Sequence, residues 1–210
     1  MPSQRKGKAR SSGRTSPWLT VWISPGEASM ELLKRHSVRA LVWIIPVLAL
    51  GTGAQRWLLS IGQRIPITLG QLALWTLAGL IIAIAMFVVG SLLFYRVGRL
   101  NGGIGSPTRI RLSVLVNMIL AFVASPLTQI APVLLGRLHP ALTYPGTPLI
   151  LWTWYVQLRV SANARSFSPW NAAVTKIMGG AVVGVPLCCA INWAFSNLPW
   201  DQILRGLGFS

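Results

Sequence analysis

Residues 69 to 95 read LGQLALWTLAGLIIAIAMFVVGSLLFY, a stretch of 27 residues without a charged side chain. About 20 apolar residues in a helix are enough to cross the hydrocarbon core of a bilayer, so this stretch crosses one with some tilt. A helix that is apolar on every side has no solvated face to offer in a soluble domain. The stretch therefore predicts an integral membrane protein.

Similar apolar stretches flank it on both sides, and we predict an all-α integral membrane bundle of five transmembrane helices. The five spans cover about residues 39–59, 69–95, 112–135, 148–160 and 177–198. Pro46 lies in the first span, and Pro126 and Pro132 lie in the third, where they predict bends. Residues 39–198 thus form one transmembrane domain, followed by a short C-terminal tail, 199–210.

The overall composition agrees with burial in lipid. Hydrophobic residues make up 53% of the 210 residues and charged residues 10%, against about 25% charged residues in soluble proteins. The 19 Lys and Arg face only Glu27, Glu31 and Asp201, for a net charge of +16. The basic residues lie in the N-terminal tail and beside the apolar stretches, which favours anionic lipids over nucleic acid as partner.

The chain before the first span has two parts. Residues 1–16 are basic and nearly devoid of apolar side chains, so we expect a disordered tail. Residues 17–38 are predicted to form a short interfacial amphipathic segment, in which Pro25-Gly26 precedes a helix at about 27–36. Trp18 and Trp22 lie four residues apart. They either anchor the segment at the membrane surface or pack on the bundle, and the two interpretations are compatible.

The charge distribution predicts the orientation. Of the 19 basic residues, 15 belong to the tail, the connection between spans two and three, or the segment between spans four and five. The remaining four are Arg56, Arg64, Arg137 and Arg205. Because basic residues gather on the cytoplasmic side, we expect a multi-pass protein of the inner (plasma) membrane with a cytoplasmic N-terminus and an external C-terminus.

The connection between spans two and three is the leading candidate for a functional surface. Its glycines and the flanking arginines form either a surface for lipid head groups or an anionic partner, or a tight turn with cytoplasmic arginines. It lacks the Gly-Lys-Ser/Thr ending of a phosphate loop. With the two tryptophans, the candidate membrane or partner surface comprises Trp18, Trp22, Arg96, Arg99, Gly102, Gly103, Gly105, Arg109 and Arg111.

Catalytic chemistry finds little support in the sequence. Cys188 and Cys189 are adjacent and lie in an apolar stretch, and His36 and His139 fall on opposite sides of the membrane in this topology. No Cys/His spacing fits a zinc site, and no Ser-His-acid set lies on one side. We expect no metal, no cofactor and no enzyme activity.

Small and polar residues inside the spans predict helix packing. Gly180 and Gly184 form a small-xxx-small pair, either for packing within the chain or for self-association. Arg159 ends the fourth span, either reaching toward the interface or lining a pathway. Polar side chains in spans are expected to bond to neighbouring helices, at about 0.6–2 kcal/mol each. They are Gln71, Asn117, Gln129, Gln157 and Asn192.

Three local sequences resemble bacterial members of the Yip family (Ypt-interacting protein, Yip-one domain). They are SPWLTVWISPGEA at 16–28, RVGRLNGGIGSPTRIRLSVL at 96–115 and LWTWYVQLRVSANARSFSPWNAAVTKI at 151–177. The likeness covers about residues 16–197. It departs from the family pattern at Gly26-Glu27, where a basic residue commonly follows the proline, and at Asn101 before the glycine pair.

The resemblance implies five spans with a cytoplasmic N-terminus and, by analogy, a role in membrane traffic. We therefore expect a non-enzymatic role in membrane organisation, scaffolding or a trafficking-like process, with other membrane proteins or a second copy as partners. The alternatives are a permease or accessory transport subunit, with Arg159 and the proline-bent third span lining its pathway, and a small structural subunit of a larger assembly.

Overall fold

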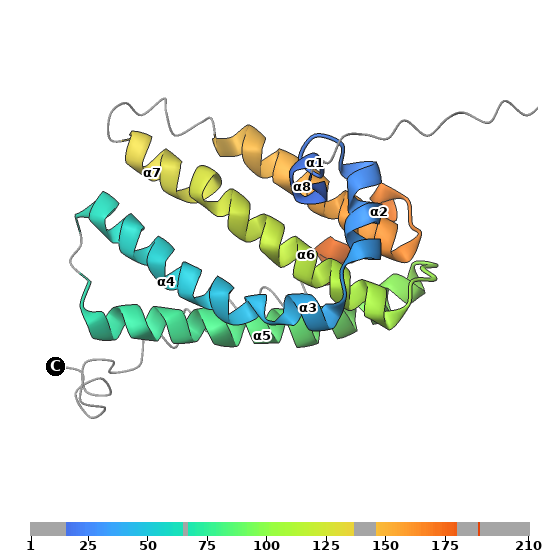
Figure 1. Cartoon of the computed structure of the whole chain (residues 1–210), viewed down its shortest axis with the longest axis horizontal. Coiled ribbons are helices and arrows are strands. Elements are labelled where there is room, and N and C mark those ends of the chain that lie inside the picture. Colours follow the sequence, from blue (N-terminus) through green and yellow to red (C-terminus); the bar gives the residue numbers. More distant parts are fainter. Residues whose placement is uncertain (1–15, 65–66, 137–145, 180–188, 190–210) are drawn as a thin grey trace, which may run out of the picture.

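The computed structural model describes residues 16–64, 67–136, 146–179 and 189, and these form helices without a β-strand (Figure 1). The predicted tails, the fifth span beyond Gly179, and the pair Gly180 and Gly184 lie outside the described residues. The helices are α1 Pro17–Thr20, α2 Pro25–Arg35, α3 Val38–Val42, α4 Ile44–Gln63, α5 Leu69–Leu100, α6 Pro107–Ser125, η1 Pro126–Ile130, α7 Ala131–Gly136, α8 Gly146–Arg165 and α9 Pro169–Gly179.

Among the described residues, three helical stretches are long and apolar enough to cross a membrane: Val38–Ile61, Leu69–Leu100 and Pro107–Val133. They coincide with the first three predicted spans. In the third stretch, 56% of an 18-residue apolar segment is buried inside the bundle, against 22% of the corresponding segment in each of the other two. The α6 stretch therefore lies at the centre of the bundle, while α4 and α5 expose apolar sides such as Ile81 and Ile84.

The first stretch is interrupted at Trp43, between α3 and α4. Pro46 explains the position of the break, since it has no N–H to donate to the carbonyl of Val42 four residues earlier. The predicted bend thus lies one turn before the proline.

The third stretch begins earlier than predicted and is irregular at its first internal proline. Ser106 caps α6, because its hydroxyl accepts a hydrogen bond from the N–H of Arg109, and Pro107 occupies the first helical position. The arginines that the sequence suggested for a loop therefore lie on a helix. At Pro126 the helix widens into the π-helical turn η1 before continuing as α7.

The fourth predicted span is contained in α8, which runs from Gly146 to Arg165 instead of ending near residue 160. It is less apolar than the three stretches above, and nine of its residues are buried. The short helix α9 follows after a turn in which Ser166 adopts a left-handed backbone, with φ of 58°.

The long helices α4, α5, α6 and α8 run side by side along the long axis, and α2 lies across one end (Figure 1). The α5–α6 connection, α2 and the α8–α9 turn meet at that end, whereas the end of α4, the start of α5 and the helix α7 lie at the other. The N-terminal segment is part of the core, because Val21, Ala28 and Leu32 pack with residues of α6 and α8. Those partners are Val116, Leu120, Val156 and Val160.

Glycines and threonines bring α4 and α5 together. A β-carbon on Gly79 would lie 3.1 Å from Cβ of Thr52, and one on Gly53 would lie 2.2 Å from the hydroxyl oxygen of Thr76. A β-carbon on Gly51 of α4 would lie 2.1 Å from Cζ of Phe122 in α6. These small residues let the helix backbones approach closely, and the contribution of Gly51, Thr52 and Gly53 was not anticipated from the sequence.

Candidate functional site

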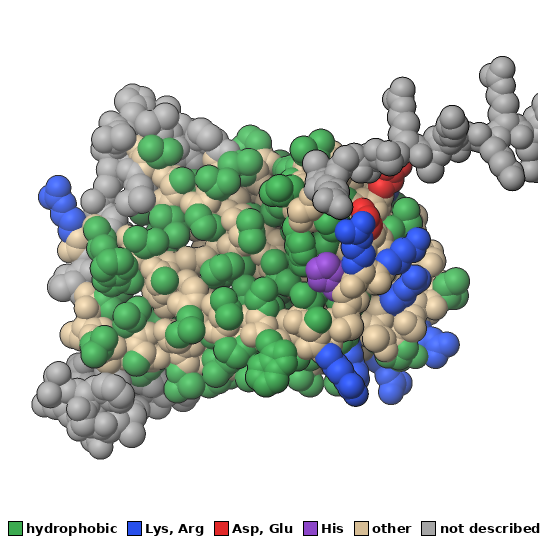
Figure 2. All heavy atoms as spheres, in the orientation of Figure 1, with side chains coloured by type: hydrophobic (Ala, Val, Ile, Leu, Met, Phe, Trp, Pro, Cys, Tyr) green, Lys and Arg blue, Asp and Glu red, His purple; other side chains and the backbone are tan. Residues whose placement is uncertain are grey.

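Basic side chains gather at the end of the molecule where α2 meets the α5–α6 connection, and apolar side chains cover the flank (Figure 2). The described basic residues that are exposed at the ends of these elements are Lys34, Arg35, Arg39, Arg96, Arg99, Arg109 and Arg111. Arg35 forms an ion pair with Glu31 one turn earlier in α2. Such an exposed pair neutralises little of the positive charge of this end and contributes little stability.

The arginines of this end differ in what they contact. Arg99 donates a hydrogen bond of 3.3 Å to the hydroxyl of Tyr95, and its guanidinium lies 5.7 Å from the centre of that ring. Within the described ranges, the side chains of Arg96, Arg109 and Arg111 form no hydrogen bond or ion pair. These three side chains are therefore available to an anionic surface.

The predicted glycine loop is folded against the protein instead of cradling an anion. The N–H groups of Gly102 and Gly103 donate to the carbonyls of Arg99 and Gly98, and the N–H of Ile104 donates to the carbonyl of Arg165. A β-carbon on Gly103 would lie 2.4 Å from the Phe167 ring. The glycines thus permit close packing on the end of α8, and the arginines carry the surface.

Arg165 lies beneath this loop and is 1% exposed. Its guanidinium lies 5.2 Å from the ring of Phe94 and 5.8 Å from that of Phe167. In the described part of the chain, its Nε and Nη1 have no hydrogen-bond partner. The aromatic faces supply electrostatic compensation for the buried charge. Nearby, the Asn101 side-chain amide donates a hydrogen bond of 3.0 Å to the hydroxyl of Thr175, and this bond connects the loop to α9.

The two predicted tryptophans are half-buried against the bundle. The indole Nε1–H of Trp18 donates 3.1 Å to Nε2 of His36, and Trp22 accepts a hydrogen bond at its carbonyl from Trp152. The exposed apolar side chains of this segment are Leu19, 69% exposed, and Ile23, 83% exposed. Sequence reasoning singled out the tryptophans of this stretch and passed over the two aliphatic residues that face outward.

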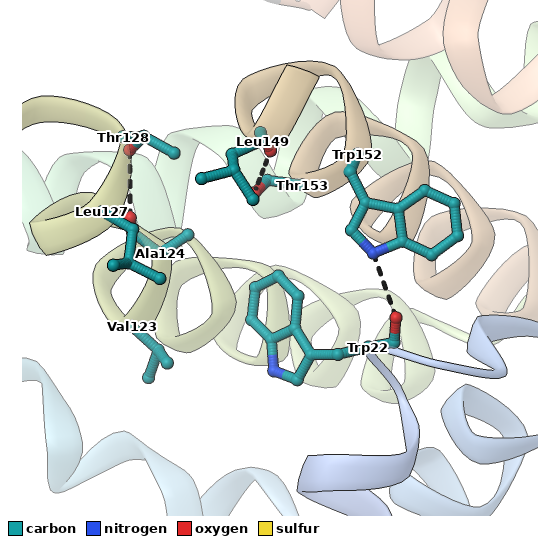
Figure 3. Close-up of a pocket in the computed structure, with 8 residues that line it drawn as sticks. All are labelled: Trp22, Val123, Ala124, Leu127, Thr128, Leu149, Trp152 and Thr153. Atoms are coloured by element: carbon teal, nitrogen blue, oxygen red, sulfur yellow. Dashed lines mark hydrogen bonds between the residues drawn. The ribbon is translucent and has the colours of Figure 1, made fainter. Parts of the chain in front are cut away.

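Trp22 also lines an apolar pocket of about 250 Å³ between α6, η1 and α8 (Figure 3). Its other lining residues are Val123, Ala124, Leu127, Thr128, Leu149, Trp152 and Thr153. The hydroxyls of Thr128 and Thr153 donate to the carbonyls of Ala124 and Leu149 within their own helices. The threonine hydroxyls therefore direct their protons to the backbone, and the pocket suits an apolar occupant.

Two of the predicted span polar residues meet between α6, α8 and α9. The Asn117 side-chain amide donates a hydrogen bond of 2.9 Å to the hydroxyl of Ser161. The Gln157 side-chain amide donates one of 3.4 Å to the backbone carbonyl of Asn117. Lys176 donates to the side-chain oxygen of Gln157, and its Nζ lies 5.2 Å from the Trp154 ring. Lys176 thus joins the cluster, although the sequence analysis counted this lysine only among the charges of the cytoplasmic side.

Two further span polar residues, Gln71 and Gln129, form no hydrogen bond to a neighbouring helix within the described residues. The side chain of Gln71 accepts from the Thr68 N–H and completes a capping box at the start of α5, and Gln129 is exposed. Asn192 lies outside the described residues. Arg159 is half-buried within α8, and its guanidinium lies against Gly26 of α2, where a β-carbon would be 3.0 Å from Nη2.

Among the described residues, no three His, Cys, Asp or Glu side chains come together as metal ligands would. No family model matches the chain, and no curated protein or solved structure is detectably similar to it.

Proposed function

We propose that this chain is a non-enzymatic, multi-pass membrane protein whose basic cytoplasmic face organises the membrane or docks partners on it, in the manner of the Yip family that it resembles. One observation carries the proposal: unpaired arginines gather at one end of a helical bundle whose flank is apolar. Anionic lipids attract each such residue by about 1 kcal/mol.

Five spans with a cytoplasmic N-terminus belong to this proposal. Besides the three apolar stretches, α8 is 20 residues long, about 30 Å of helix, and exposes Leu149, Ile150 and Leu151. In the proposed topology α9 leads into the fifth span at 177–198. The basic end of the bundle then faces the cytoplasm, as the excess of basic residues on that side requires.

The topology is tested with reporter tags on the two ends of the full chain. Five spans put an N-terminal tag in the cytoplasm and a C-terminal tag outside. Tags that report the same compartment overturn the odd number of spans. Extraction of the protein from membranes without detergent overturns the membrane location itself.

The role of the basic face is tested by charge reversal. Two full-chain variants are compared for binding to vesicles that contain phosphatidylglycerol: one with Arg96, Arg109 and Arg111 changed to Glu, and one with five tail residues changed to Glu. The five are Arg5, Lys6, Lys8, Arg10 and Arg14. We expect weaker binding for each, with a smaller difference in high salt. Unchanged binding of a variant removes that segment from the mechanism.

The runner-up function is a permease or an accessory transport subunit, and the polar cluster around Lys176 favours it. A lysine that contacts Gln157 between helices is the kind of group that marks an ion or substrate pathway. Flux in reconstituted vesicles that disappears in Lys176→Met or Arg159→Ala supports transport. A purified chain without flux supports the organising role.

A further inference from the structure

A second cavity, a lateral groove of about 220 Å³, lies where α3, α5 and α6 meet. Its lining residues are Val38, Phe87, Val88, Ser91, Leu92 and Arg111. Val88 and Leu92 are 48% and 54% exposed, so the groove opens on the flank of the bundle. Most of its wall is apolar, and one serine and one arginine are the exceptions.

Ser91 is 5% exposed, and its hydroxyl has no hydrogen-bond partner among the residues that the structure describes. Helical serines ordinarily donate to a carbonyl of the preceding turn. Ser60, Ser113 and Ser125 do so here, with oxygen–oxygen distances of 2.6–2.8 Å. A buried hydroxyl without a partner is unfavourable, so the unused donor and acceptor of Ser91 point to a ligand atom in the groove.

Arg111 lies on the α6 side of the same groove and is exposed. It is held by no carboxylate or hydroxyl in the described ranges, unlike Arg35 and Arg99. An arginine beside an apolar groove matches a ligand that has both a phosphate and a hydrocarbon chain.

The two polar groups differ in depth. Arg111 lies four residues after Pro107, the start of α6, and Ser91 lies nine residues before Leu100, the end of α5. At about 1.5 Å per residue, Ser91 is about 8 Å deeper than Arg111 from the basic end. A phospholipid has the same order, with the phosphate outermost, the glycerol oxygens below it and the acyl chains deepest.

We propose that this groove binds one anionic phospholipid. Arg111 binds the phosphate, the Ser91 hydroxyl bonds a glycerol ester oxygen, and an acyl chain lies along Phe87 and Val88. The inference rests on the proposed membrane location, and it adds a defined lipid site to the general attraction of the basic face.

The test is native mass spectrometry of the detergent-purified full chain titrated with phosphatidylglycerol. We expect one preferential site that Arg111→Gln weakens about fivefold, the loss corresponding to one interfacial arginine. Arg64→Gln is the control, because it also removes one exposed arginine, but at the end of α4, away from the basic face and from the groove. It should leave this site unchanged. Diacylglycerol with the same chains, which lacks the phosphate, should bind about as weakly as phosphatidylglycerol binds Arg111→Gln.

Ser91→Ala supplies a second readout that a purely structural serine would not give. Without lipid, the variant should melt at a higher temperature than the wild-type chain, because an unpaired buried hydroxyl is removed. With phosphatidylglycerol, the wild-type chain should gain more in melting temperature than the variant.

Three results would overturn the site: equal lipid affinity of Arg111→Gln and Arg64→Gln, equal binding of diacylglycerol and phosphatidylglycerol, or equal lipid-induced stabilisation of Ser91→Ala and the wild-type chain. Any of these leaves the proposed function standing if the chain still requires detergent and shows the expected topology. Extraction without detergent would remove both.

Discussion

The indole Nε1–H of Trp152 in α8 donates a hydrogen bond of 3.0 Å to the backbone carbonyl of Trp22, 130 residues earlier in the chain. Trp22 lies in the turn between α1 and α2, where the carbonyl has no helical partner. The bond therefore fixes that turn on α8, next to the buried Val21. The N-terminal segment is docked on the bundle at this point, and its position depends on a helix far away in the sequence.

Replacing Trp152 by Phe should loosen the N-terminal segment while the ring continues to pack. Loss of one such hydrogen bond is expected to cost about 1 kcal/mol. The measurement is limited proteolysis of the full chain in detergent, in which cleavage between α1 and α2 should become faster. Trp170→Phe is the control, because Trp170 is 75% exposed and lies on α9. Equal cleavage of both variants would contradict the role of the Trp152–Trp22 bond.

A second attachment of the same segment is Asn163, whose amide donates 2.7 Å to the carbonyl of Gly26 and 2.5 Å to the hydroxyl of Ser29. Asn163→Ala should destabilise the docked α2 by about 1–3 kcal/mol, because Ser29 is buried and loses a partner. Thermal unfolding in detergent measures the effect. Asn171→Ala, on α9, should leave the melting temperature nearly unchanged. If the two variants melt alike, α2 is held by apolar packing alone.

The sequence was sufficient to predict the apolar stretches, because burial in lipid requires a composition that a window of 20 residues reveals. The 69–95 stretch lies inside a single helix, α5, and only its end shifted, to Leu100. The sequence Ser106-Pro107 is also typical of the start of a helix, and it could have predicted the start of α6. This start was missed because Arg109 and Arg111 were assigned to the connection between the two spans.

The groove between α3, α5 and α6 was beyond sequence reasoning. Ser91 is one small polar residue in an apolar stretch, and its missing partner depends on which neighbour its side of the helix faces. Arg111 was predicted to lie on the cytoplasmic side, but its position in the same groove as Ser91 depends on how α5 and α6 cross. The same limit applies to Lys176, whose contact with Gln157 follows from the turn at Ser166.

The contact between Asn117 and Ser161 should couple α6 to α8. In a double-mutant cycle of Asn117→Ala and Ser161→Ala, we expect an interaction energy of about 0.6–2 kcal/mol, since such bonds between membrane helices fall in that range. The free energy of unfolding is measured in mixed micelles for the wild-type chain, the two single variants and the double variant. The control cycle pairs Asn117→Ala with Thr52→Ala, which bonds within α4, and should give a value near zero. A zero value for the Asn117–Ser161 cycle would show that the contact does not hold the helices together.

Gly105 and Gly90 should respond oppositely to alanine. A β-carbon on Gly105 would lie 2.5 Å from the carbonyl oxygen of Ala164 and 2.9 Å from Cα of Arg165, so the α5–α6 connection would have to move away from α8. We expect Gly105→Ala to destabilise the fold by about 1–3 kcal/mol through overpacking.

At Gly90, inside α5, a β-carbon meets nothing within 4 Å among the described residues. Gly90→Ala should therefore stabilise the helix by about 0.5–1 kcal/mol through reduced backbone entropy of the unfolded chain. The measurement is the melting temperature of each variant in the same detergent. A stable Gly105→Ala variant would mean that the connection does not rest on the end of α8, and the burial of Arg165 would then need another cause.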